Sequence, residues 1–216
     1  MLIACWSAKG GSGTTTVATA LALLLAKRSP GGALLVDLAG DIPMVLGRPR
    51  PVGPGVAEWS TSPGVTSAAL QRLVEQGEAN IGVLTRGEGP IDGERAAEGL
   101  AFLAGADHPV VVDCGVIDDA GSVAIPVAAA ANLSLLVTRA CYLGLRRAVA
   151  APIRPSAVVL VEEKHRTLGP AEVSSTLGVP IRAIVPIDSG VARAVDTGLL
   201  SVRMPRSLAH ALRDAA

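Results

Sequence analysis

The chain has 216 residues, half of them hydrophobic, which is enough for one well-buried domain and too few to require two. Its 19 basic and 19 acidic residues give a formal net charge of zero, which excludes a chain-wide basic field for nucleic acid and leaves room only for local patches. Three widely spaced cysteines without a Cys-x-x-Cys motif argue against a disulfide framework or a zinc site. No apolar run approaches the roughly 20 residues of a membrane span, so we expect a cytoplasmic protein without a membrane partner.

The first half of the chain alternates apolar runs with helical patterns. The run at 2–6 predicts a strand, and residues 14–27 predict a helix with apolar side chains on nearly every face. A second strand is predicted at 33–36. Residues 38–63 are rich in Gly and Pro, and we interpret them as a long surface excursion with one helical turn at 56–59. The same reasoning predicts helices at 65–76 and 92–104 and strands at 81–84 and 110–113.

The second half repeats the alternation. Strands are predicted at 133–138, 157–161 and 181–185, and helices at 122–131, 142–151, 170–177, 191–200 and 207–215. Continuous apolar strands between helices indicate a mostly parallel sheet with helices on both faces. We therefore expect a three-layer α/β fold in which residues 1–216 form a single domain.

A glycine-rich loop, SAKGGSGTTT at 7–16, joins the first strand to the first helix. In such a loop the backbone N–H groups and the helix N-terminus together attract phosphate oxygens. Thr15 occupies the position at which a P-loop hydroxyl holds Mg²⁺. The loop predicts a phosphate site made by Gly10, Gly11, Ser12, Gly13, Thr14, Thr15 and Thr16.

Two of the apolar strands end in a carboxylate, Asp37 and Asp113. The carboxyl ends of parallel strands meet at one edge of a sheet, where ligands of open α/β folds gather. We expect both carboxylates to lie beside the glycine loop.

The loop departs from the pattern GxxxxGK[ST], because Ala8 replaces the first Gly and Thr14 replaces the phosphate-binding Lys. Lys9 stands directly before the glycine pair, and in the form KGGxGxTT the stretch resembles the deviant Walker A ATPases of the ParA/MinD group. Segments LLVD at 34–37, VVVDCG at 110–115 and IVPIDSGVARAVDTG at 184–198 follow in the order of that family, as in short MinD-like proteins of high-GC bacteria. The resemblance implies a P-loop NTPase-like fold, ATP or ADP with Mg²⁺, a homodimer and an unidentified protein partner.

The resemblance also implies roles for individual residues. Lys9 would reach across the dimer interface to the partner's nucleotide, and Asp113 would hold Mg²⁺ through water. Asp37 would be a switch I carboxylate near the metal, next to the Thr15 hydroxyl. Pro186 would lie near the adenine base.

Two departures from the family bear on catalysis. The family commonly carries Asp-x-Asp after the second strand, and Ala39 replaces the Asp that orients the attacking water; Asp41 takes over this role if the loop bends differently. The neutral Thr14 forgoes a charge-assisted bond of roughly 1.5–3 kcal/mol, which binding survives. A missing water-positioning carboxylate costs on the order of 10²–10⁴ in rate. We expect weak or absent hydrolysis, unless Lys9 acts on the phosphates of its own subunit.

Two function classes follow. One is a nucleotide-dependent switch that positions chromosome, septum or a polar machine, and the other is a pseudo-ATPase scaffold that acts through protein contacts. A metabolic P-loop ligase is a third class, but it needs catalytic side chains that we do not find. A further group of arginines forms either a surface for DNA phosphates, which the net charge does not support, or a solvated helix face: Arg139, Arg146, Arg147 and Arg154.

Overall fold

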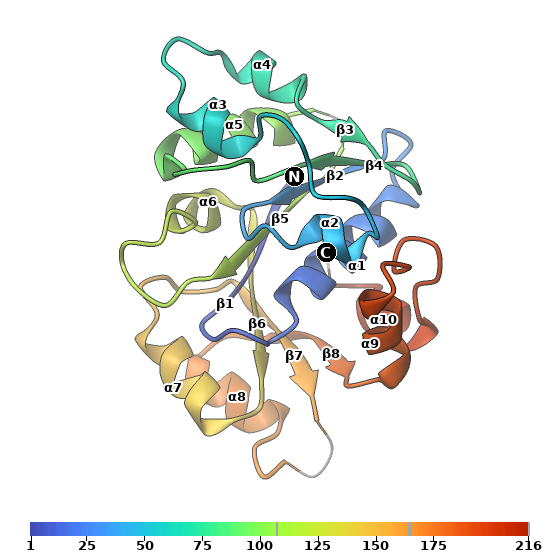
Figure 1. Ribbon diagram of the computed structural model, residues 1–216. Coiled ribbons are helices and arrows are strands. Elements are labelled where there is room, and N and C mark those ends of the chain that lie inside the picture. Colours follow the sequence, from blue (N-terminus) through green and yellow to red (C-terminus); the bar gives the residue numbers. More distant parts are fainter. Residues whose placement is uncertain (107, 164–165, 216) are drawn as a thin grey trace.

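The computed structural model describes residues 1–106, 108–163 and 166–215. Its centre is an eight-stranded sheet with the order β3-β4-β2-β5-β1-β6-β7-β8, in which only the short β3 runs antiparallel to its neighbour (Figure 1). The strands are β1 Leu2–Ser7, β2 Ala33–Asp37, β3 Glu75–Gln76, β4 Ile81–Leu84, β5 Val110–Val116, β6 Leu133–Arg139, β7 Ala157–Glu162 and β8 Ile181–Pro186. The expectation of a mostly parallel sheet is confirmed.

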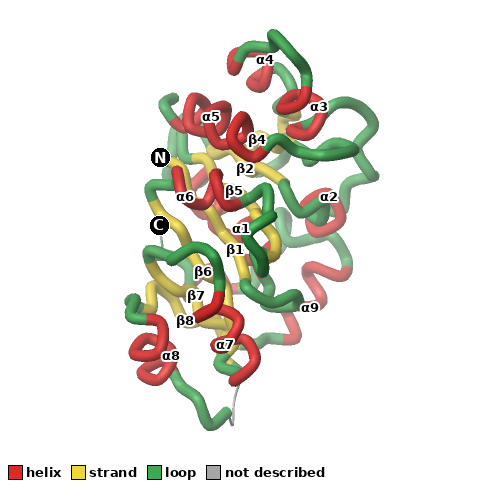
Figure 2. The backbone as a smooth tube through the Cα atoms, turned by 90° about the vertical axis from the view of Figure 1, so that its left-hand side faces the viewer, coloured by secondary structure: helices red, strands yellow, loops and turns green. Residues whose placement is uncertain are grey.

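Helices cover both faces of this sheet, as Figure 2 shows from the side. One face carries α3 Val56–Thr61, α4 Ser67–Gln71, α5 Gly93–Ala104, α6 Ile125–Ala130, α7 Tyr142–Ala150 and α8 Pro170–Leu177. The other carries α1 Thr14–Ala26, α2 Ile42–Val45, α9 Ser189–Asp196 and α10 Arg206–Ala211. Within the described part of the chain, no helix has the length and apolar character needed to cross a membrane.

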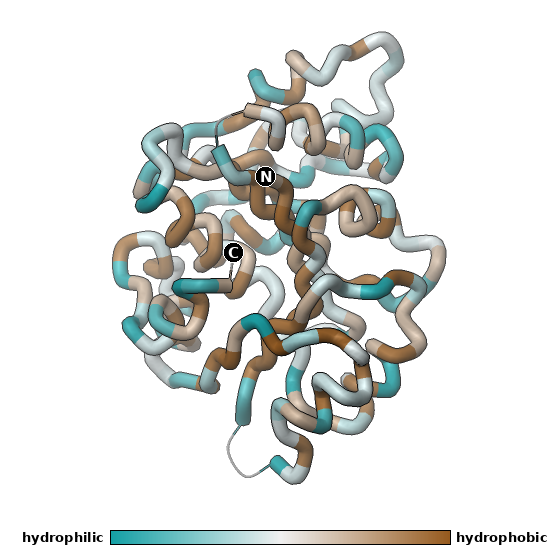
Figure 3. The backbone as a smooth tube through the Cα atoms, turned by 180° about the vertical axis from the view of Figure 1, so that it is seen from behind, coloured by the Kyte–Doolittle hydropathy of each residue, from teal (hydrophilic) through white to brown (hydrophobic). Residues whose placement is uncertain are grey.

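The central strands are mostly apolar because both of their faces are covered. In β1 the side chains of Leu2, Ala4 and Trp6 enter one core, while Ile3 and Cys5 enter the other. This alternation follows from the two-residue period of a strand. Figure 3 shows the resulting band of hydrophobic residues through the middle of the molecule.

The helical turn predicted at 56–59 is confirmed as part of α3, but the prediction of a surface excursion at 38–63 is wrong, because this segment is anchored in the core. It forms α2 and α3, and Ile42, Val56 and Trp59 are at most 5% exposed. The Gly and Pro residues between them shape the turns, while a few widely separated apolar side chains supply the burial.

The helix predicted at 65–76 is also wrong over most of its length. Helix α4 spans only Ser67–Gln71 and is held by the fully buried Leu70. The chain then turns into β3, whose Glu75 and Gln76 pair with β4. Pairing with a sheet edge satisfies backbone groups that a longer helix would have satisfied internally.

Candidate nucleotide-binding site

The glycine loop links β1 to α1 through two residues with positive φ. Gly11 has φ 75° and Gly13, directly before α1, has φ 91°, a region that Gly adopts without a Cβ clash. The Ser12 hydroxyl donates to the Lys9 carbonyl at 2.7 Å and holds the loop in this shape. No side chain caps the N-terminus of α1, so its first N–H groups remain available to an anion.

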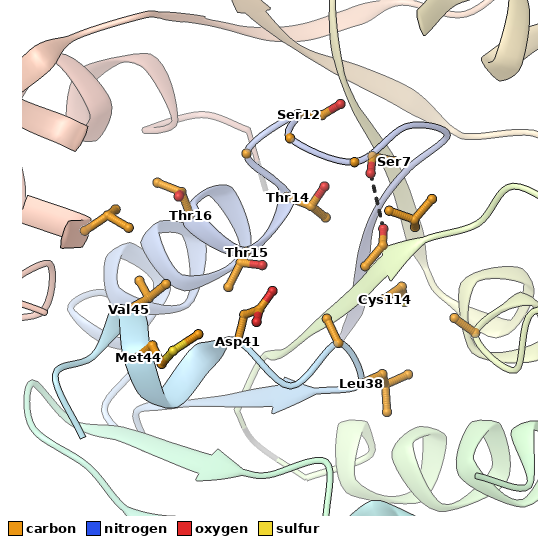
Figure 4. A pocket seen from close by; sticks show the side chains of 18 of the residues that line it. Ser7, Ser12, Thr14, Thr15, Thr16, Leu38, Asp41, Met44, Val45 and Cys114 are labelled. Atoms are coloured by element: carbon orange, nitrogen blue, oxygen red, sulfur yellow. Dashed lines mark hydrogen bonds between the residues drawn. The ribbon is translucent and has the colours of Figure 1, made fainter. Parts of the chain in front are cut away.

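A cavity of about 840 Å³ opens in front of this helix N-terminus (Figure 4). Its walls come from the carboxyl ends of β1, β2 and β5 and from the end of α9. The lining residues are Ser7, 10–16, Leu38, Ala39, Asp41, Met44, Val45, 114–116, 122–124, Val195 and Asp196.

Most of the predicted phosphate-site residues line this cavity, namely 10–16, together with Asp41. Lys9 is outside the lining, with its ammonium 3.5 Å from the Gly10 carbonyl. Pro186 is also outside the lining. Near α9 the wall of the cavity is made by Val195 and Asp196. The cavity therefore has two carboxylates and no cationic side chain among its described lining residues.

Asp37 organises the loop that forms one wall. The β2–β5 register sets Asp37 directly opposite Asp113. The Asp37 carboxylate accepts hydrogen bonds from the N–H of Gly40 at 2.5 Å and of Ile42 at 3.1 Å. Burial raises the pKa of Asp37, and these N–H groups oppose the rise. Both oxygens are thus engaged in fixing the turn into α2, and the side chain does not line the cavity.

Asp113 is 0% exposed and does not itself line the cavity, although the next residue, Cys114, does. One carboxylate oxygen accepts from the Gly115 N–H at 3.0 Å, and the other has no hydrogen-bond partner among the described residues. Burial raises the pKa of Asp113 to about 6, the Thr15 hydroxyl and the Gly115 N–H lower it, and the charges of Asp37 and Asp41 raise it again. A buried carboxylate with a free oxygen beside a hydroxyl fits the oxygen ligands that Mg²⁺ prefers.

Asp41 and Ala39 complete the wall that faces the loop. The Asp41 carboxylate points toward the Thr15 hydroxyl (Figure 4). Ala39 packs against Gly115, since a Cβ built on Gly115 would lie 3.1 Å from the Ala39 methyl. Ala39 also lines the cavity, where its side chain offers only a methyl group.

The sequence reasoning missed the far wall and one thiol of the cavity. Cys114 lines it, and burial, with the nearby Asp113 charge, raises the pKa of its thiol well above the ordinary value, so the thiol stays protonated. Its position after Asp113, at the carboxyl end of a strand, was a signal that could have found it. Val195 and Asp196 carried no such signal, because they lie at the end of a helix far along the chain.

A backbone contact joins the far wall to the turn that follows α2. A Cβ on Gly47 would lie 2.6 Å from the Gly198 carbonyl oxygen, and a Cβ on Gly198 would lie 2.3 Å from the Gly47 Cα. Both residues have positive φ, at 64° and 66°. Only glycine at both positions permits this approach.

A strand, a glycine loop and an open helix N-terminus at the carboxyl edge of a parallel sheet define the P-loop class of α/β folds. No protein-family model and no curated protein sequence matches the chain. Solved structures do match it and place its fold with the ParA/MinD ATPases.

A ParA family ATPase from Chlorobium tepidum TLS is 21% identical, with a TM-score of 0.80 and coverage of 99% of this chain and 96% of that one. The septum site-determining protein MinD from Pyrococcus horikoshii OT3, complexed with Mg-ADP, is 19% identical with a TM-score of 0.76, covering 99% and 93%. MinD in the MinC:MinD complex of Aquifex aeolicus is 19% identical with a TM-score of 0.79, covering 99% and 93%. At these identities the likeness establishes the fold.

Proposed function

We propose that the chain is a ParA/MinD-like nucleotide-binding switch in intracellular positioning, such as chromosome partitioning, septum placement or polar machinery, with weak or absent ATP hydrolysis. The observation that carries the proposal is the cavity of about 840 Å³ at the open N-terminus of α1. Solved proteins of the same fold support it, since one is complexed with Mg-ADP and another is in complex with MinC. Under this proposal residues 1–216 form one domain, around the single described sheet.

The N–H groups of 10–16 would bind the phosphate oxygens of ATP or ADP. The Thr15 hydroxyl and the free oxygen of Asp113 would hold Mg²⁺, directly or through water, and Asp41 is a further carboxylate beside them. The ion supplies the positive charge that neutralises the phosphates. The only charged side chains in the described lining are the carboxylates of Asp41 and Asp196. Binding of an anionic nucleotide therefore depends on this ion and on backbone amides.

Low turnover follows from two lining residues. Thr14 brings a hydroxyl where an ammonium would stabilise charge developing on the phosphates, and Ala39 brings a methyl against Gly115. These two features also favour the second candidate, a pseudo-ATPase scaffold that acts through protein contacts without a nucleotide cycle. Asp41 is the carboxylate that could restore water positioning, although its side chain is directed at Thr15.

The position of Lys9 supports a homodimer. Its ammonium contacts the Gly10 carbonyl and Lys9 does not line its own cavity, which is consistent with a role at the nucleotide of a second copy. We expect Lys9→Ala to weaken nucleotide-dependent dimerisation while leaving the melting temperature of the monomer unchanged. Sedimentation with and without ATP measures this, and a variant that dimerises like the parent in both conditions would place Lys9 outside the interface.

The experiment that tests the function is titration calorimetry with ATP and ADP, with and without Mg²⁺, alongside a phosphate-release assay. We expect binding only with Mg²⁺ and phosphate release near background. Absence of binding to both nucleotides would reject the switch in favour of the scaffold. Robust hydrolysis that Asp41→Ala abolishes would overturn the low-turnover proposal and assign the carboxylate role to Asp41.

A further inference from the structure

Helix α7 packs its inner face against the core and exposes large side chains on its outer face. Gly144, Leu145 and Ala148 are buried against the core. On the outside, Tyr142 is 70% exposed and Leu143 is 49% exposed. Tyr142 is the only tyrosine in a chain with four aromatic residues, counting two Trp and one Phe. Large apolar groups at this exposure are a common mark of a contact surface.

In the sequence around α7 every charged residue is an arginine, although α8, which packs against α7, carries Glu172. Residues 120–161 contain four arginines and no Asp, Glu or Lys, in a chain whose formal net charge is zero. The Arg146 guanidinium stacks over the Tyr142 ring at 5.9 Å from the ring centroid. No described carboxylate forms an ion pair with these four side chains, all of which are exposed: Arg139, Arg146, Arg147 and Arg154.

We propose that this α7 face, made by Tyr142, Leu143, Arg146, Arg147 and Val149, docks an acidic amphipathic segment of a partner protein. Helix α7 has 9 residues, so at 1.5 Å per residue the face is roughly 13 Å long, about two turns of a partner helix. Apolar side chains of the segment cover the exposed apolar groups, and flanking carboxylates pair with the guanidinium groups.

The same features argue against two other occupants. Phosphates of a nucleic acid would pair with the arginines but leave Leu143 and Val149 uncovered, although both are more than 40% exposed. A lipid surface needs a larger apolar area than three side chains provide, because membrane binding grows with buried apolar area. A protein segment satisfies the charged and the apolar parts together.

The α7 face adjoins the sheet edge that carries the glycine loop. Helix α7 follows β6, and β6 pairs with β1, which leads into the loop. The face shares no residue with the cavity lining, so the inference does not rest on nucleotide binding. It adds to the proposed function the chemistry of the partner and the place where it docks.

The test uses a fluorescent synthetic helical peptide with one Leu face and one Glu face, and anisotropy as the readout. Arg146→Glu with Arg147→Glu should weaken peptide binding at least about tenfold, since two attractive pairs become repulsive. The matched control, Arg203→Glu with Arg206→Glu, makes the same charge change on exposed residues at α10 and should bind like the parent. Tyr142→Ser, which keeps every charge, should weaken binding several-fold, and circular dichroism checks the fold of each variant.

Further probes give the opposing outcomes. A Lys/Leu peptide should not bind, and an all-Glu peptide should bind more weakly than the Glu/Leu peptide. Equal binding of the parent and the α7 variants, or no binding by the parent, would overturn the proposal. A double-stranded DNA or a phosphatidylglycerol vesicle that binds the α7 face while the Glu/Leu peptide does not would overturn it in favour of that ligand.

Discussion

Replacing Thr14 by Lys adds a cationic side chain to a cavity whose described lining has none. Thr14 is the first residue of α1, is 7% exposed and lines the cavity, so a Lys side chain there would extend into the space in front of the helix N-terminus. A charge-assisted hydrogen bond to phosphate contributes roughly 1.5–3 kcal/mol, which corresponds to about 10- to 100-fold in affinity. We expect Thr14→Lys to tighten binding of Mg-ADP by this factor in titration calorimetry.

The control is Thr14→Met, which has nearly the length of Lys without its charge and should bind no tighter than the parent. A buried ammonium in an empty site is costly, so Thr14→Lys should also lower the melting temperature without ligand and show a larger rise on adding Mg-ADP. Equal affinity of the Lys and Met variants would refute the reasoning, because it would mean that no phosphate reaches Thr14.

Three further predictions concern catalysis, protonation and packing. Thr14→Lys with Ala39→Asp should raise ATP turnover by more than the product of the single changes, since both groups would act on one transition state; a simple product in phosphate-release assays would contradict this. The pKa of Asp113 rises from 3.8 to about 6 on folding, so between these two pH values the native state binds more protons than the unfolded state. The free energy of unfolding therefore falls as the pH rises through this range. In metal-free buffer the free energy of unfolding of Asp113→Asn, measured with urea, should therefore equal that of the parent below about pH 4 and exceed it by about 3 kcal/mol above about pH 6. A difference that does not change with pH would contradict this prediction. Gly47→Ala should destabilise the fold by roughly 1–3 kcal/mol more than Gly64→Ala, which has a similar positive φ but open space around its Cβ, as thermal unfolding can measure.

The sheet and the glycine loop could be predicted because their signals are local. The predicted strands are mostly apolar runs, and the order strand, glycines, threonines, helix is contained within a short stretch of chain. The register that sets Asp37 opposite Asp113 follows from two parallel strands that end at one sheet edge.

The segments that could not be predicted depend on contacts between distant residues. Ile42 and Val56 are 0% exposed, yet each stands among Gly and Pro residues that indicate a surface loop. Both oxygens of Asp37 bind the turn that follows it, a use that the resemblance to ATPases with a switch I carboxylate does not reveal. The wall made by Val195 and Asp196 depends on how α9 packs against α2, which no local pattern encodes.

The contact between Gly47 and Gly198 joins two segments that lie far apart in the sequence. The backbone after α9 contacts the turn that follows α2, and at the same time the end of α9 supplies a wall of the cavity. Deleting the chain from Gly198 onward would remove no residue of the glycine loop and would still open the site on that side. A C-terminal truncation at Gly198 would therefore open the cavity and at the same time remove the buried Leu200, Leu208 and Leu212 from the hydrophobic core.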